Sequence, residues 1–191
     1  MSDALLREAI AHHSAGRLNE AGVLYARILA ADPQNPDALH LSGLVAYKQR
    51  RFDEAIGLVR RALAQAPGNA VFHGNLGNIL KDAGGRDDAI ASYRRALALD
   101  AAQIPARNNL GVLLLEAGDA HAAIDAFRDV LARKSDHFRA EANLGKALIA
   151  VGDAVGAEAA LRRALQLERM PPRGSRVKYS SCTIVHATTS S

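Results

Sequence analysis

Three asparagine residues recur along the sequence at one fixed interval. Asn75, Asn109 and Asn143 are 34 residues apart, and each directly precedes a Leu-Gly pair. An amide side chain both donates and accepts hydrogen bonds, so it can bind a peptide backbone without reading the side chains that the backbone carries. A regular row of amides therefore suits an extended segment. The same asparagines could instead brace neighbouring repeats, and the sequence leaves both roles open.

Patterns typical of catalysis or metal binding are missing from the sequence. It contains no nucleophile elbow, HExxH motif, paired CxxC motif or phosphate-binding loop. The seven histidines are scattered, and the adjacent His12 and His13 point to different sides of a helix. Cys182 has no basic neighbour in sequence that would make it a nucleophile. We therefore predict no catalytic residue, no metal and no cofactor, and expect that the chain is not an enzyme.

The elements that position the asparagines repeat with the same period. Glycine, alanine and leucine each recur every 34 positions in one register: Gly43, Gly77, Gly111 and Gly145; Ala21, Ala55, Ala89, Ala123 and Ala157; Leu29, Leu63, Leu97, Leu131 and Leu165. Within each unit the apolar spacing is helical, and a turn signal separates two helices. We expect the large side chain four residues after the alanine, such as Tyr93 or Phe127, to fill the space that the glycine leaves.

This pattern resembles the tetratricopeptide repeat (TPR), whose 34-residue unit has a small residue at position 8, alanine at 20, an aromatic at 24 and proline at 32. The run Asn108-Asn109-Leu110-Gly111 is also similar to the repeat region of bacterial relatives of the O-linked N-acetylglucosamine transferase. The resemblance implies an all-α fold, a right-handed α-solenoid of five helix–turn–helix TPR units. The expected units are 2–35, 36–69, 70–103, 104–137 and 138–171, and 172–191 is expected to be a polar, flexible tail.

The same resemblance implies that the first helix of each unit lines a concave groove. In the first two units the groove residues form an apolar strip: Leu6, Ile10, His40, Leu41, Leu44 and Tyr47. In the later units they are polar or basic: Asn75, Asn78, Lys81, Asn108, Asn109, Arg139, Asn143 and Lys146. In the glycosyltransferase relatives such an asparagine column is associated with gripping extended polypeptides. We therefore expect a non-catalytic scaffold that binds an extended peptide or a partner helix in this groove.

The repeats are also compatible with two other functions. The chain could be the substrate-recruiting segment of a larger glycosyltransferase- or sulfotransferase-type enzyme whose catalytic domain is not in this sequence. It could also self-associate through uncapped solenoid ends, because an apolar flank around Ala147, Leu148 and Leu161 is expected to be partly open. Carboxylate capture of the chaperone type is poorly supported, since Gly74 and Asn143 stand where two cations are needed.

Composition and charge narrow the remaining classes of partner. The net charge is +4, but Arg169, Arg173, Arg176 and Lys178 all follow Glu168, so the repeats are close to neutral and we expect no nucleic-acid binding. The sequence has no long uncharged apolar run, which predicts no membrane span. Acidic residues at positions 3 and 8 argue against a secretion signal, and we expect a cytoplasmic location.

Overall fold

The structure is a computed structural model that describes residues 2–169. Within this range the chain forms ten α-helices and no strand. The helices are α1 (Ser2–Ser14), α2 (Leu18–Ala31), α3 (Pro36–Lys48), α4 (Phe52–Gln65), α5 (Ala70–Asp82), α6 (Arg86–Leu99), α7 (Ile104–Glu116), α8 (Ala120–Arg133), α9 (Phe138–Ala150) and α10 (Ala154–Arg169). The predicted all-α helical repeat solenoid is confirmed. The expected tail, 172–191, lies outside the described residues.

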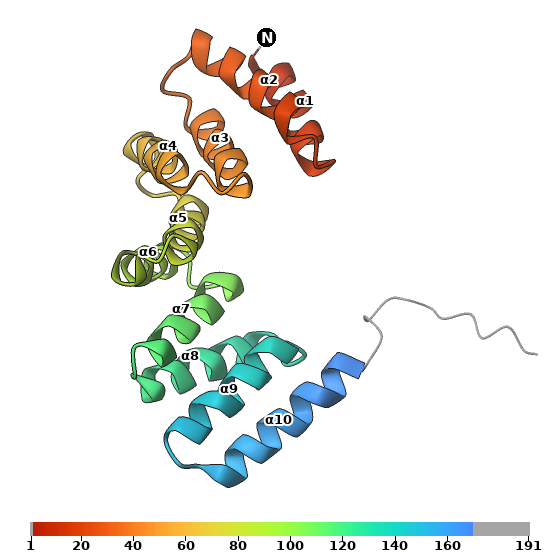
Figure 1. Ribbon diagram of the computed structural model, residues 1–191, viewed down its shortest axis with the longest axis vertical. Coiled ribbons are helices and arrows are strands. Elements are labelled where there is room, and N and C mark those ends of the chain that lie inside the picture. Colours follow the sequence, from red (N-terminus) through yellow and green to blue (C-terminus); the bar gives the residue numbers. More distant parts are fainter. Residues whose placement is uncertain (1, 170–191) are drawn as a thin grey trace, which may run out of the picture.

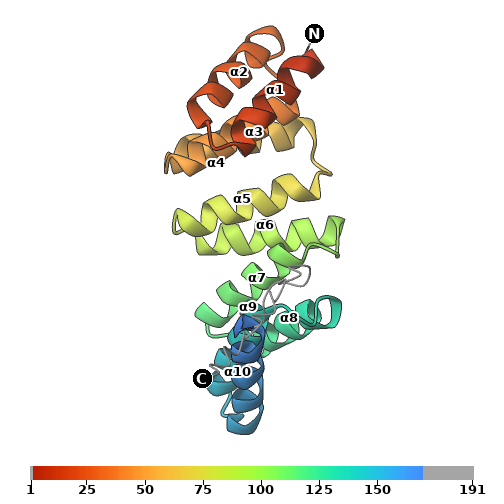
Figure 2. The same cartoon turned by 90° about the vertical axis from the view of Figure 1, so that its right-hand side faces the viewer.

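The helices form five hairpins that stack along the long axis of the molecule (Figure 2). The second helix of each hairpin packs on the first helix of the next. The stack is bent, and α3 and α5 lie on the inner side of the bend while α4 and α6 lie on its outer side (Figure 1). Further along, α5 contacts α7 and α7 contacts α9. We call the side formed by the odd-numbered helices the concave face.

Short local signals set where the helices begin and end. The side chain of Asn69 accepts hydrogen bonds from the backbone N–H groups of Val71 and Phe72 at 3.0 and 3.2 Å, and so caps the N-terminus of α5. The turn after α5 contains Gly84 in a left-handed conformation, with φ of +88°. In the second repeat Arg50 occupies the equivalent position with φ of 60°, which is costlier for a residue with a Cβ.

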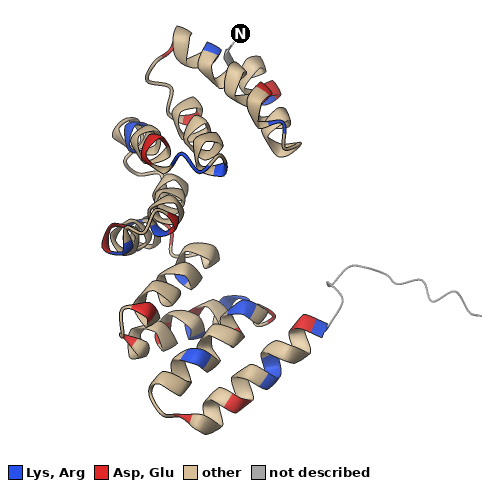
Figure 3. Cartoon of the chain, in the orientation of Figure 1, with Lys and Arg blue, Asp and Glu red and all other residues tan. Residues whose placement is uncertain are grey.

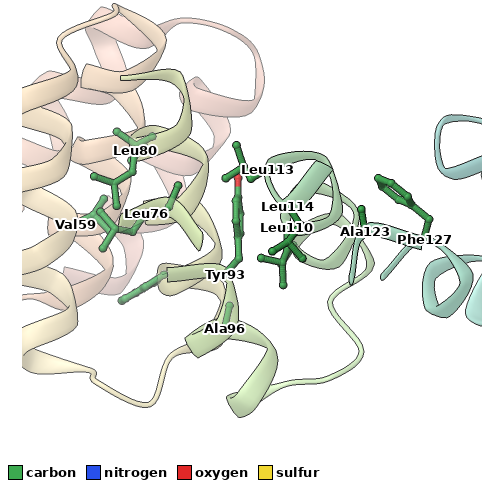
Figure 4. Packing of buried hydrophobic residues seen from close by; sticks show 14 of the residues in the cluster. Val59, Leu76, Leu80, Tyr93, Ala96, Leu110, Leu113, Leu114, Ala123 and Phe127 are labelled. Carbon is green, nitrogen blue, oxygen red and sulfur yellow. The ribbon is translucent and has the colours of Figure 1, made fainter. Parts of the chain in front are cut away.

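Close approach of the two helices in each repeat depends on glycine. A Cβ placed on Gly77 would lie 2.6 Å from Cε1 of Tyr93, and one on Gly111 would lie 2.7 Å from Cε1 of Phe127. Both rings are fully buried. Tyr93 stands between α5 and the leucines of α7 (Figure 4). The expectation that a large side chain fills the space left by the repeated glycine is therefore confirmed.

The apolar core runs through the stack in two clusters that meet at α3. Ala38 and Val45 of α3 belong to the N-terminal cluster, whereas Leu39 and Ala46, on the same helix, belong to the cluster that continues to α10. Each repeat thus buries its apolar surface against its neighbours, as expected for a solenoid.

The expected open flank at the C-terminal end was partly wrong. Ala147 is fully buried and Leu148 is 5% exposed, because both lie on the side of α9 that packs against neighbouring helices. The exposed large apolar side chains of this hairpin are instead Phe138 and Ile149 on α9, at 39 and 60%, and Val155 and Leu165 on α10, at 82 and 53%.

Lys, Arg, Asp and Glu residues are scattered along the helices, with both signs of charge interspersed (Figure 3). One ion pair, between Arg60 and Asp88 at 3.4 Å, joins neighbouring repeats, and both side chains are exposed. Such a pair contributes at most about 1 kcal/mol. None of the helices between residues 2 and 169 has the length and apolar composition needed to cross a membrane.

Candidate peptide-binding face

The first asparagine of the row, Asn75 on α5, is bonded to the preceding repeat. Its Nδ2 atom donates to Nε2 of His40 on α3 at 2.8 Å. His40 is 6% exposed and stacks on the ring of Phe72, with centroids 4.2 Å apart and planes at 22°. Burial, with a smaller contribution from His13, lowers the pKa of His40 to about 4. The imidazole is therefore neutral near pH 7, which leaves Nε2 free to accept this hydrogen bond.

The second asparagine, Asn109 on α7, also bonds to the preceding repeat. Its Nδ2 atom donates to Oδ1 of Asn78 on α5 at 2.8 Å. The hydroxyl of Tyr93 on α6 donates to the same oxygen at 2.7 Å. Asn78 therefore joins three helices through one carbonyl oxygen. Two of the sequence-predicted site residues, Asn78 and Asn109, thus lie together and brace the third and fourth repeats.

The third asparagine, Asn143 on α9, differs from the other two. Its half-buried side chain makes no hydrogen bond with any residue in the described part of the chain. Arg139 and Lys146 lie four residues before it and three residues after it, so the three side chains share one face of α9. Both cations are exposed, and Ile149, exposed at 60%, lies one turn beyond Lys146.

The other predicted polar residues have local partners or are covered. Nζ of Lys81 forms an ion pair with Oδ1 of Asp82 at 3.2 Å. The Asp82 carboxylate also accepts a hydrogen bond from the hydroxyl of Tyr47, one repeat earlier. Asn108 is only 9% exposed, and its Oδ1 has no hydrogen-bond partner within residues 2–169. Because its side chain is almost entirely covered, Asn108 is a weaker candidate for direct ligand contact than Asn143.

The expected apolar strip is largely used for packing. Leu41 packs against the N-terminal cluster, while Leu44 and Tyr47 pack against the longer cluster. All three side chains remain only partly exposed. Burial, followed by the hydrogen bond to Asp82, raises the pKa of Tyr47 to about 12, so the hydroxyl stays protonated and acts as a donor.

The concave face contains a hollow that the sequence does not predict. We call it the Gly74 hollow. It has a volume of about 250 Å³ between α5 and α7 and is lined by Val71, Gly74, Asn75, Asn78, Gln103, Pro105 and Ala106. The Nε2 atom of Gln103 is buried and has no hydrogen-bond partner among the described residues. Gln103 and Val71 do not belong to a repeated motif. The available signal is Gly74 itself, because the equivalent position is His40 in the second repeat and Asn108 in the fourth.

The described side chains provide no cluster suited to a metal. No three His, Cys, Asp or Glu residues between positions 2 and 169 come close enough together to hold an ion. Histidine side chains serve local structure instead, as at the start of α9, where Nδ1 of His137 accepts from the backbone N–H of Ala140 at 3.1 Å.

Five stacked helical hairpins with an open, polar inner face define an α-solenoid of the protein-interaction type. Two family models described as Tetratricopeptide repeat match the sequence, one over residues 12–74 and 114–178 and the other over residues 75–135. The chain belongs to the tetratricopeptide repeat family. Membership supports a role as a protein-interaction scaffold, whereas the closer likeness to glycosyltransferase repeat arrays stays a prediction.

Solved structures share this fold. A crystal structure of MamA has 24% sequence identity and a TM-score of 0.78, and the match covers 84% of this chain and 94% of MamA. YrrB, described as a TPR protein with an unusual peptide-binding site, has 22% identity and a TM-score of 0.75, with 86% of this chain and 84% of YrrB covered. At such identities the likeness shows the fold alone. No curated protein matches the sequence.

Proposed function

We propose that the concave face binds an extended polypeptide segment of a partner protein. The observation that carries this proposal is the state of Asn143. It is the one asparagine of the repeated row that makes no hydrogen bond to another repeat within residues 2–169, and it lies between two exposed cations. An extended peptide offers backbone N–H and C=O groups that pair with such an amide at little cost.

The surroundings of Asn143 indicate which segment fits best. Arg139 and Lys146 attract acidic side chains, and rim charges of this kind mainly accelerate association. Ile149 adds exposed apolar surface one turn beyond Lys146. An acidic segment with an apolar residue after its acidic part therefore suits α9. Asn75 and Asn109 contribute indirectly, because their hydrogen bonds join α5 to α3 and α7 to α5.

The test uses peptides selected from a random display library on the full chain. Fluorescence anisotropy then gives the dissociation constant of each selected peptide. Asn143→Ala is expected to weaken binding about fivefold, which corresponds to one net hydrogen bond of about 1 kcal/mol. Arg94→Ala, at an exposed position on the outer helix α6, is the matched control and leaves binding unchanged. Equal affinities for Asn143→Ala and the parent chain would contradict the proposal.

Self-association is a second candidate role, favoured by the apolar surface of α10. Val155 and Leu165 are 82 and 53% exposed. Leu165 is one of the leucines that recur every 34 residues; Leu63, at the same position in the second repeat, is only 9% exposed because the next repeat covers it. Sedimentation velocity over a wide concentration range tests this role. A concentration-dependent dimer that Leu165→Glu abolishes supports it, and a monomer at all concentrations eliminates it.

A further inference from the structure

Neighbouring repeats fill one shared interface position in different ways. Between the second and third repeats the rings of His40 and Phe72 stack, with centroids 4.2 Å apart. The residues 34 positions further along are Gly74 and Ala106. A pair of stacked rings at one interface is therefore replaced, at the next interface, by two residues with almost no side chain.

The Gly74 hollow lies beside these two small residues, and the side chain of Gln103 fills part of the space that they leave. Its volume of about 250 Å³ exceeds the roughly 150 Å³ of an engineered cavity known to bind benzene, so the hollow has room for one aromatic ring. Val71 and Pro105 form apolar walls. Val71 is 55% exposed, which leaves one face of its side chain available for packing against a ligand.

The side-chain amide of Gln103 lines the Gly74 hollow. Its Nε2 atom is buried, whereas its Oε1 atom lies beside Gly74, 3.0 Å from the point that a Cβ on Gly74 would occupy. The hydroxyl at the polar end of a tyrosine ring can donate a hydrogen bond to this oxygen.

We propose that the Gly74 hollow is a specificity pocket for an aromatic side chain of the bound partner, with tyrosine preferred over phenylalanine. The ring lies beside Gly74 and Ala106, whose counterparts one repeat earlier are His40 and Phe72, and the phenol hydroxyl donates to Oε1 of Gln103. The amides of Asn75 and Asn78, at the rim, lie beside the backbone of the same partner residue. The identity of the partner rests on the proposed function, but small aromatic compounds probe the pocket independently.

The experiment titrates the full chain with three probes: N-acetyl-tyrosinamide, N-acetyl-phenylalaninamide and N-acetyl-leucinamide. Nuclear magnetic resonance follows the backbone amide of Gly74 and the side-chain amide of Gln103. We expect both signals to shift together with the aromatic probes. The tyrosine probe is expected to bind about tenfold more tightly than the leucine probe, a difference of about 1.4 kcal/mol.

Two variants separate the pocket from a general surface effect. Gly74→His with Ala106→Phe transplants the upstream ring pair, fills the hollow and is expected to abolish the shifts. Gln103→Met keeps a side chain of similar volume but removes the amide. It is expected to lower the affinity of the tyrosine probe to that of the phenylalanine probe. If the double variant does not fold, the single Gln103 variant still decides the phenol preference.

The outcomes that overturn the pocket differ from those that overturn the proposed function. Equal binding of all three probes, no shift at Gly74, or unchanged shifts in a folded double variant would each overturn the pocket. Library peptides that bind through Asn143 without any aromatic residue would then leave the proposed function standing. Probe binding at Gly74 without any peptide binding would support the pocket and contradict the proposed function.

Discussion

Nδ2 of Asn109 on α7 donates a hydrogen bond of 2.8 Å to Oδ1 of Asn78, which lies one repeat earlier on α5. The same oxygen accepts from Tyr93, so α5, α6 and α7 are joined at a single atom. Asn75 is similarly committed to His40, whereas Asn143 has no such bond within residues 2–169. The row that is uniform in sequence therefore divides into two bracing residues and one residue available to a ligand.

This division predicts different stabilities for two asparagine variants. Asn109→Ala removes a bond between repeats and leaves Asn78 with one donor fewer, so it is expected to lower the free energy of unfolding by about 1–2 kcal/mol. Asn143→Ala is expected to change it by less than about 0.5 kcal/mol. Urea unfolding followed by circular dichroism measures both. Equal losses for the two variants would contradict the division.

Packing at the repeated glycine gives a second prediction. Even a Cβ on Gly111 would lie 2.7 Å from Cε1 of Phe127, so Gly111→Leu overpacks this contact. The variant is expected to lower the free energy of unfolding by about 1–3 kcal/mol or more. Gly57→Leu is the matched control, because Gly57 lies in α4 with open space around its Cβ position. Thermal melts compare the two variants. A Gly111→Leu melt that matches the parent would show that this contact is not tight.

Backbone conformation predicts opposite signs for two glycine-to-alanine changes. Gly84 has φ of +88°, and a Cβ there would have no atom within 4 Å. Gly84→Ala is therefore expected to lower the free energy of unfolding by about 1 kcal/mol, because alanine is strained in the left-handed conformation. Gly57→Ala sits in a helix and is expected to raise stability by up to about 1 kcal/mol. Urea midpoints measure both signs, and a destabilised Gly57→Ala would point to a helix contact not accounted for.

His40 predicts a loss of stability in mild acid. Burial lowers its pKa from 6.5 to about 4 in the folded chain, so between these values the unfolded chain binds more protons. Stability contributed by neutral His40 is thus complete above pH 6.5 and falls by up to about 3 kcal/mol as the pH drops to 4. The pKa values of His13 and His137 are also lowered, mainly by burial, and add to the same slope.

Urea unfolding between pH 7.5 and pH 4 measures this slope. His40→Gln keeps a polar partner for Asn75 and is expected to flatten the slope, whereas His121→Gln, at an exposed position on α8, leaves it unchanged. A parent chain whose stability does not change over this range would refute the assignment.

The parts of the fold that repeat could be predicted from the sequence. The contact between Gly77 and Tyr93 could be predicted because a small residue and a large residue both recur every 34 positions, at fixed places in the unit. The contacts that differ between units could not be predicted, because they depend on which side chains face each other across an interface. The Gly74 hollow depends on a missing side chain, and the bond between Asn109 and Asn78 depends on a variable position. The burial of Ala147 could not be predicted either, because it depends on which side of α9 packs against the neighbouring helices.

The central claim is that a partner segment lies along the concave face. A library-selected peptide carrying a spin label, added to the full chain, broadens the backbone resonances of residues near it. Broadening is expected along α5, α7 and α9, including the region around Asn143, and none is expected at Arg94 on the outer helix α6. Broadening centred on α4, α6 and α8, with the signals around Asn143 unaffected, would contradict it.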